Sequence, residues 1–474
     1  MSKADSPVAV FAYLGVKPTD YRIKTLLILL SGSLYGVLLA GSGAGLGSTV
    51  TDKVLALSIL GASATGRISG LLFAMSASLS GIAWARRVID LGFGNMQLTE
   101  YMVLGMVINV VLHFIVHPVS MPKQLKRLIL FAFLPASAFA LAASIGGWVN
   151  GNPEYVRPLR ACLVVVGFLY AFLNITNIDR ARRVFFGVVY LAVMTYLIRL
   201  GVLPFLADVP KGLGPFLLAA PVISILLLSK ITPVIRMCII LAVLLFALMS
   251  TFTIFLSVAL VVALFCSYHA RGIIIRRLML FCLIAYTLAM IFVGVSVVRD
   301  ELISGVGATV MEMDAVVSQG EFFTAPLDRI RYKVYDRLVL WIPAIVEVAD
   351  APFELNAGAR PLVIQQLSGV DEGSWTIHVH NVFIEVMRQF SLPGSIFFNV
   401  LIFAALITLW RSLKQRRRYD SYLLAWSLFG LSFLPGFIFG FYPVAGEIGI
   451  YFWLACGISY KLRLSDNQNQ TTYQ

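Results

Sequence analysis

Long apolar runs separated by short polar segments recur along the chain from Leu26 to Tyr460. Most reach the roughly 20 residues with which an α-helix crosses a bilayer. They are continuously apolar, and in lipid each crossing must satisfy its own backbone hydrogen bonds, so we expect helices. The pattern predicts spans near residues 25–44, 54–85, 98–117, 128–148, 159–177, 184–206, 212–229, 233–249, 251–269, 278–298, 381–410, 421–441 and 446–460.

The stretch 54–85 leaves the number of crossings open. Gly61, Gly66 and Arg67 interrupt it, so either it forms two short segments or a neighbouring segment does not cross. Basic residues near both chain ends predict that both ends lie in the cytoplasm, which requires an even number of crossings. We therefore expect an all-α polytopic membrane protein with 12–14 transmembrane helices, about twelve being the central prediction.

Composition agrees with this fold class. Hydrophobic residues make up 59% of the chain and charged residues 13%, with a mean hydropathy of +0.87. Soluble globular proteins carry about 25% charged residues. All five cysteines lie in apolar runs, so no disulfide framework or metal-binding spacing is indicated and packing is the expected role. They are Cys162, Cys238, Cys266, Cys282 and Cys456.

The net charge of +13 is concentrated in short basic clusters between the apolar runs. Such clusters are retained in the cytoplasm, so they predict orientation and no nucleic-acid partner. Binding of anionic lipid or RNA by these clusters is the less favoured alternative. The clusters are Lys123–Arg127, Arg180–Arg183, Arg271–Arg277, Arg411–Arg418 and Lys461–Arg463.

This orientation places residues 299–380 outside, as a large periplasmic loop before the last three helices. The loop holds half of the 24 acidic residues of the chain, and it is too long to be a simple connector. We expect three parts: a transmembrane bundle at 1–298, the loop at 299–380, and C-terminal helices with a cytoplasmic tail at 381–474. Within the loop, the pattern predicts a helix over 324–348 with Trp341, Ile345 and Val348 on one apolar face.

Two short motifs lie in the loop and where it re-enters the membrane. Arg337-x-x-x-Trp341 is followed by His380-Asn381-x-x-Ile384, with Gly394 downstream. Together with the predicted topology, these two motifs resemble those of the O-antigen ligase and O-antigen polymerase superfamily of bacterial cell-envelope glycan enzymes. Two positions depart from that pattern. Gln389 stands where the family often has an acidic residue, and the turn Ser250-Thr251-Phe252 lacks the arginine that many ligases carry.

The resemblance implies a reaction and a location. A glycan linked to undecaprenyl pyrophosphate is transferred to an acceptor hydroxyl at the periplasmic face of the bacterial inner membrane, without metal, nucleotide sugar or other cofactor. In a ligase the acceptor is lipid A–core. In a polymerase it is another lipid-linked glycan. The motifs slightly favour a ligase, and the missing arginine near Ser250 argues for a polymerase.

The chemistry of the residues agrees with such a reaction. Histidine titrates near neutral pH and suits a base for the acceptor hydroxyl, so we expect His380 to be catalytic. Arginine matches phosphate oxygens, so Arg337 is expected to bind the pyrophosphate or glycan. Asn381 is expected to orient the site or to cap the helix. The alternatives are an interfacial histidine for His380 and a surface ion pair with Asp336 for Arg337.

Three further residues near His380 are candidates for substrate binding. His378 is two positions away, but a zinc site would need further ligands, so metal binding is disfavoured. Trp341 is either a substrate platform or an interfacial anchor. Glu385 is either solvated or holds His380.

Several arginines lie at the predicted outer ends of spans, where the positive-inside rule does not expect them. Charged residues near lipid are costly and are candidates for functional sites. We expect Arg157, Arg160 and Arg199 to bind the anionic substrate, with Arg299 adding to their field. The alternative is that each extends to lipid phosphates.

A flippase or transporter for lipid-linked glycan is the main alternative of another class. Transporters tend to show internal repeats and mid-membrane charges. The chain shows no convincing repeat, and these arginines gather at the predicted outer face. A non-catalytic scaffold is less favoured still.

Overall fold

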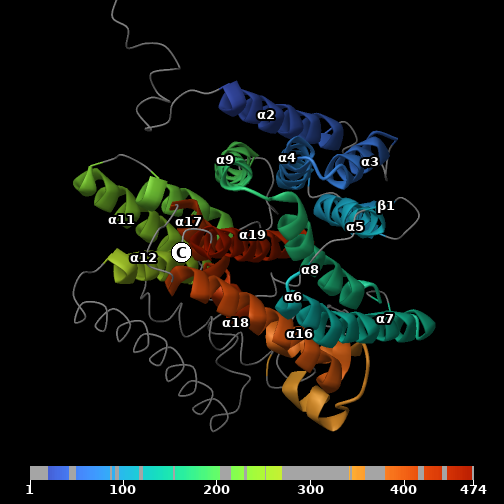
Figure 1. Cartoon of the computed structure of the whole chain (residues 1–474). Helices are drawn as coiled ribbons and strands as arrows, with labels where there is room; N and C mark the ends of the chain where they lie inside the picture. The colour runs from blue at the N-terminus through green and yellow to red at the C-terminus, as the bar shows by residue number, and fades with distance from the viewer. Residues whose placement is uncertain are drawn as a thin grey trace, which may run out of the picture.

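The computed structural model describes an α-helical bundle with one small hairpin (Figure 1). The described residues are 20–41, 50–85, 88–90, 95–116, 121–152, 155–202, 215–228, 232–250, 252–269, 341, 344–357, 379, 381–414, 421–439 and 446–471.

The first helices resolve the ambiguous stretch 54–85. It forms two helices, α3 (Val50–Ala64) and α4 (Ile68–Ala85), after α2 (Asp20–Gly41). Gly66 lies between them with a φ of 66°, a left-handed conformation that favours glycine. The two-segment interpretation is therefore confirmed. The antiparallel strands β1 (Val88–Asp90) and β2 (Asn95–Gln97), which the pattern did not predict, lead into α5 (Leu98–Val116).

The predicted span 128–148 is part of a longer rod. It consists of α6 (Lys123–Leu128), the π-helical turn η1 (Ile129–Phe133) and α7 (Leu134–Val149). The following helices are α8 (Arg157–Asn174), α9 (Ile178–Val202), α10 (Pro215–Ile223) with the π turn η2 (Ser224–Leu228), α11 (Pro233–Ser250) and α12 (Phe252–His269). The C-terminal helices are α16 (Val382–Lys414), α17 (Ser421–Leu431), α18 (Leu434–Phe439) and α19 (Gly446–Thr471).

Six segments of the described chain are long and apolar enough to cross a membrane. They lie in α2, α5, the α6–α7 rod, α8, α16 and the α17–α18 pair, and shorter apolar helices lie in α4, α10–η2, α11 and α12. These helices make the chain an all-α membrane protein. The predicted span 278–298 and most of the loop 299–380 lie outside the described residues, so the number twelve stays a prediction.

Burial separates inner from outer helices. In α8, 67% of the spanning window is buried, whereas in the α6–α7 rod the share is 28%. The outer helices expose large apolar side chains such as Leu34, Phe131 and Leu141, as a lipid-facing surface requires. α19 packs along α8 and α17, so the C-terminal helices pack directly against the N-terminal bundle. Where α2 crosses α4, a Cβ on Gly36 would meet the backbone of Ala77, so only glycine permits this close approach.

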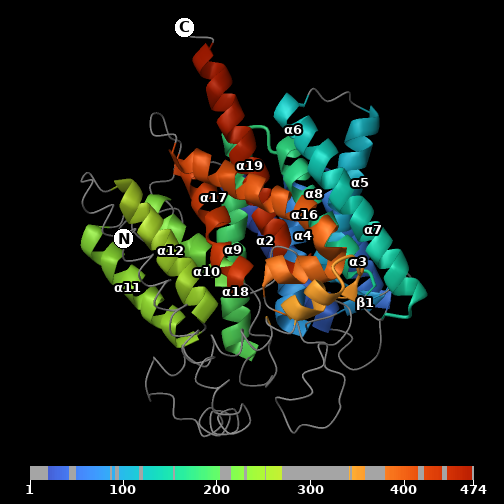
Figure 2. The same cartoon turned by 90° about the horizontal axis from the view of Figure 1, so that it is seen from below.

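The two ends of the bundle differ in the elements that meet there (Figure 2). At one end α5, α8 and α16 begin, and the β1–β2 hairpin and residues 344–357 lie beside them. We refer to it as the hairpin end. At the opposite end α8 and α16 terminate near α6 and the C-terminal part of α19. Basic residues of these elements lie there, among them Lys126, Arg127, Arg411 and Arg463. We refer to it as the basic end.

The helix predicted over 324–348 falls largely outside the described residues, but residues 344–350 are helical. The predicted apolar face is wrong at Ile345, whose side chain is exposed. Ala344 is buried instead, and it packs with Trp341, Val379 and Ile384. The packed face is therefore shifted by one position, because this short helix lies against the start of α16.

Candidate functional site: a buried ionic network at the hairpin end

The start of α16 is fixed on both sides of His380. The side-chain Oδ1 of Asn381 accepts hydrogen bonds from the backbone N–H groups of Phe383 (3.0 Å) and Ile384 (3.2 Å), which makes it an N-cap. Before it, the buried Val379 accepts a hydrogen bond through its carbonyl from the indole Nε1 of Trp341 at 2.9 Å. The helix-capping role expected of Asn381 is therefore present, and Trp341 is bonded to the protein backbone.

Glu385, one turn into α16, is at the centre of the network. Its side chain is only 2% exposed, so the interpretation that it is solvated is wrong. Its Oε1 accepts a hydrogen bond from Nη1 of Arg157 at 3.4 Å and one from Nε2 of Gln389 at 2.8 Å. Among the described residues, its buried Oε2 accepts none. An ionised carboxylate has capacity for several hydrogen bonds, so this oxygen keeps an unused acceptor inside the site.

Arg388 joins α16 to the described end of the long loop. Its guanidinium is fully buried, and Nε donates to Oε2 of Glu347 at 2.7 Å. Nη2 donates to the carbonyl oxygen of Ala357 at 3.2 Å. Removing a guanidinium from water is costly unless charged and polar partners replace the water, and residues 344–357 supply both.

The same loop segment satisfies the backbone at a kink in α16. Ser391 has φ 62° and ψ 170°, and Pro393 follows, so the helical hydrogen-bond ladder is broken there. The N–H of Leu392 donates to the carbonyl of Pro352 at 2.8 Å. The carbonyl of Gln389 accepts a bond from the N–H of Asn356 at 3.1 Å. The kink and the loop segment therefore depend on each other.

Two glycines allow the close packing of α7 beside this kink. A Cβ on Gly147 would collide with the side-chain amide of Asn356, a fully buried residue at φ 62°. A Cβ on Gly394 would lie 2.9 Å from Cβ of Phe139 on α7. Gly394 is the glycine of the family-like motif, and here it permits the approach of two helices.

The first turn of α8 carries a second ion pair, one turn beyond Arg157. Nε of Arg160 lies 3.1 Å from Oε1 of Glu100 in the first turn of α5. The other oxygen of Glu100 accepts a hydrogen bond from the N–H of Gln97 at 2.7 Å, so the hairpin helps to hold it. The side chains of Arg157 and Arg160 are 14% and 28% exposed. Their positions are thus set by buried carboxylates while part of each remains accessible.

The structure brings together several of the residues expected from the sequence. Asn381, Glu385, Trp341 and Arg157 meet around the start of α16. Arg160 lies one turn after Arg157 on α8 and pairs with a separate carboxylate. Arg337, His378 and His380 lie outside the described residues, and Arg199 is described only as a position in α9.

Four members of the network were not identified from the sequence, and Gln389 was noted only as a departure from a pattern. The missed residues are Glu100, Glu347, Asn356 and Arg388. One signal was available: residues 385, 388 and 389 are spaced i, i+3, i+4, so three polar side chains share one face of an apolar helix. The partners on other elements carry no comparable local signal.

The arrangement presents two partly exposed arginines, each paired with its own buried carboxylate, and one of these carboxylates, Glu385, keeps an unused oxygen. It suits binding of an anion at the edge of the bundle, with the carboxylate available to orient a proton donor. Among the described residues, no group of three histidine, cysteine or carboxylate side chains has the geometry for a metal. Comparisons of the chain with models of known protein families, with curated proteins and with solved structures find no match.

Proposed function

We propose that this protein is a multi-pass glycosyltransferase of a bacterial inner membrane. It takes a glycan from undecaprenyl pyrophosphate and transfers it to an acceptor hydroxyl at the periplasmic face. The hairpin end is then the periplasmic end, and the basic end lies in the cytoplasm, as the positive-inside rule favours.

The proposed step balances without a metal or redox partner. The acceptor oxygen attacks the anomeric carbon of the donor sugar, the bond from that carbon to the pyrophosphate oxygen breaks, and a glycosidic bond forms. His380 accepts the hydroxyl proton. Undecaprenyl pyrophosphate leaves with its negative charge, which Arg337, Arg157 and Arg160 stabilise.

The observation that carries the proposal is the buried ionic network next to His380 in the chain. Charges are expensive at the edge of a membrane bundle and mark functional sites. Here Glu385, Arg388 and Gln389 lie near the start of α16, and Arg157 on α8 contacts Glu385. The backbone is fixed immediately before and after His380. A catalytic base needs this kind of support, because small displacements from the reacting atoms reduce the rate strongly.

Within this class we favour a ligase that uses lipid A–core as acceptor, with a polymerase of O-antigen or exopolysaccharide as the alternative. Both use the same donor chemistry. Incubation with a lipid-linked single repeat and no other acceptor separates them, because only a polymerase forms a ladder of products.

The main test compares wild type, His380→Ala and His113→Ala in detergent. His113 lies in α5, outside the proposed site, and serves as a matched control. Each protein is incubated with undecaprenyl-pyrophosphate-linked glycan, with and without lipid A–core. The gel shift of the acceptor and the released undecaprenyl pyrophosphate are measured. We expect transfer by wild type and His113→Ala, and a loss of about 100-fold or more in His380→Ala, the usual contribution of a general base.

Two outcomes contradict the proposal. Full activity of His380→Ala removes this residue from catalysis. Absence of transfer by a wild-type protein that binds the lipid-linked donor, across several donor glycans, favours the flippase instead.

A further inference from the structure

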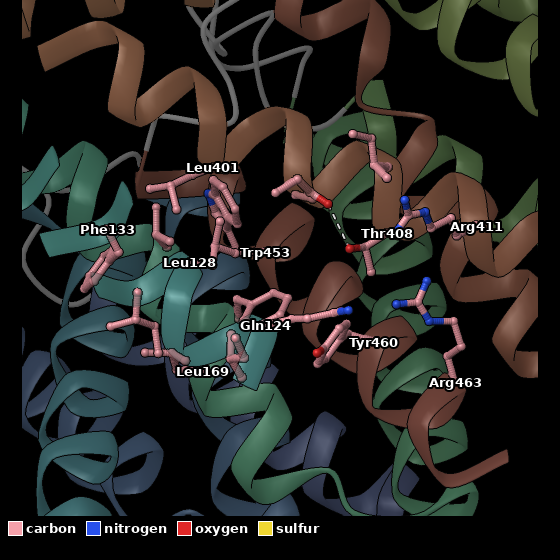
Figure 3. Close-up of a pocket in the computed structure, with 17 residues that line it drawn as sticks. Gln124, Leu128, Phe133, Leu169, Leu401, Thr408, Arg411, Trp453, Tyr460 and Arg463 are labelled. Carbon is pink, nitrogen blue, oxygen red and sulfur yellow. Dashed lines mark hydrogen bonds between the residues drawn. The ribbon is translucent and has the colours of Figure 1, made fainter. Parts of the chain in front are cut away.

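A pocket of about 280 Å³ lies at the basic end, away from the ionic network (Figure 3). It is enclosed by α8, α16, α19 and the α6–η1 segment. Its walls are mainly apolar, with Phe133, Leu169, Leu401 and Trp453 among them. The volume is near the lower end of the range of about 300–1,000 Å³ for small-molecule pockets.

The pocket opens on the surface that faces lipid. Ile407, one of its lining residues, is 48% exposed, and Phe133, another lining residue, is only partly buried. An acyl chain can therefore enter from the bilayer without crossing the helical core.

One end of the pocket is strongly basic. Arg411 at the end of α16 and Arg463 on α19 both line it, and Figure 3 shows their guanidinium groups on the same side. No salt bridge to either is present in the part of the chain that the structure describes. Burial lowers the pKa of Arg463, the neighbouring Tyr460 raises it, and the charge of Arg411 lowers it, with a net lowering. Arg463 is partly buried and Arg411 is exposed, so two cations line the outer end of the pocket, and an anion between them would reduce their repulsion.

A π-helical turn forms part of the same wall. η1 contributes Ile129 and Phe133 to the pocket, between α6 and α7. π turns are rare and are frequently found at functional sites. This turn is a second observation, independent of charge, that points to a shaped site.

We propose that this pocket binds one acidic phospholipid, with an acyl chain along the apolar wall and the phosphate between Arg411 and Arg463. Guanidinium groups match phosphate oxygens in geometry and charge, and two of them can share one phosphodiester. The basic clusters alone favoured an orientation signal over lipid binding. The pocket supplies the apolar contact that a cluster of charges lacks. The site does not depend on the proposed transfer reaction.

The test uses delipidated full-length protein in a neutral detergent. Binding of phosphatidylglycerol and of phosphatidylcholine is measured by native mass spectrometry. We compare wild type with Arg411→Gln/Arg463→Gln and with a pocket-filling variant, Ala404→Phe. The control is Lys123→Gln/Arg127→Gln, which removes the same charge from exposed positions of α6 that do not line the pocket.

We expect wild type and the α6 control to bind phosphatidylglycerol at least about tenfold more tightly than phosphatidylcholine. Both lipids carry a phosphodiester, but the cationic choline group of phosphatidylcholine is repelled by the two arginines and cancels the net negative charge. The double arginine variant should lose this preference, and Ala404→Phe should reduce the binding of both lipids. Glycerol phosphate, which has no acyl chain, should not compete. Equal loss in the α6 control, competition by glycerol phosphate, or unchanged binding in Ala404→Phe would each overturn the proposal.

Discussion

The two ends of the helical bundle use arginine in opposite ways. At the hairpin end, Arg157, Arg160 and Arg388 each contact a carboxylate that is supplied by a different element. At the basic end, Arg411 and Arg463 share a pocket with each other, and no described carboxylate neutralises them. At the first end each arginine is held by a carboxylate of the protein, whereas at the second end the two arginines line a pocket without a described carboxylate.

This difference shows what each end requires for stability. A buried guanidinium is tolerated only with charged and hydrogen-bonding partners, so the hairpin end depends on distant segments being in place. An arginine at a membrane surface can be compensated by lipid phosphate, so the basic end needs no carboxylate partner from the protein. Substitutions should therefore destabilise the first end and leave the second unchanged or slightly more stable in neutral detergent.

The largest effect is expected for Glu385→Ala. It leaves Arg157 and Gln389 without their shared acceptor, and removing one member of a buried pair typically costs about 3–5 kcal/mol. We expect a marked fall in the melting temperature in detergent and loss of transfer activity. The double variant Arg157→Met/Glu385→Leu should recover part of the stability but none of the activity. A double variant that is as unstable as the sum of the two single variants would contradict the ion pair.

A smaller effect is expected for Arg388→Met, which should release residues 344–357 from α16. The change removes two hydrogen bonds of a charged group, but Glu347 can then be hydrated, so the expected cost is about 2–3 kcal/mol. Limited proteolysis should cut this segment faster than in wild type. Asp350→Asn, at an exposed position of the same helical segment, is the control and should be cut at the wild-type rate. Equal rates for all three proteins would show that Arg388 does not hold the segment.

The smallest effect, and of opposite sign, is expected for Arg463→Gln. It removes one of two like charges, so the free energy of unfolding in neutral detergent should stay constant or rise by at most about 1 kcal/mol. Thermal unfolding in dodecyl maltoside, with and without phosphatidylglycerol, measures this. Added phosphatidylglycerol should stabilise wild type more than the variant. A clear loss of stability without lipid would mean that Arg463 has a structural role inside the protein.

The helices were largely predictable from the sequence. The predicted span 98–117 corresponds to Leu98–Val116, and the predicted span 159–177 overlaps Arg157–Asn174 closely. Such agreement is expected because a run of apolar residues in lipid has no stable alternative to a helix. The β1–β2 hairpin and the kink at Ser391 were not predicted, since short strands carry a weak pattern and the kink depends on backbone partners at Pro352 and Asn356.

The candidate site was only partly predictable. The sequence singled out Arg157, Arg160, Asn381 and Glu385 as unusual, because charged and capping residues stand out against apolar helices. It did not identify which groups pair. Arg157 and Glu385 are 228 positions apart, and Glu347 meets Arg388 across 41 positions.

The sequence by itself therefore determined the fold class, the position of most helices and the short list of chemically unusual residues. These follow from hydropathy and charge, which act locally along the chain. Only the tertiary structure decided that Glu385 is buried and paired, that residues 344–357 complete the backbone of a kinked helix, and that two arginines share one pocket. Those features arise from packing between elements, where the cost of burying a charge or an unpaired N–H selects the partner.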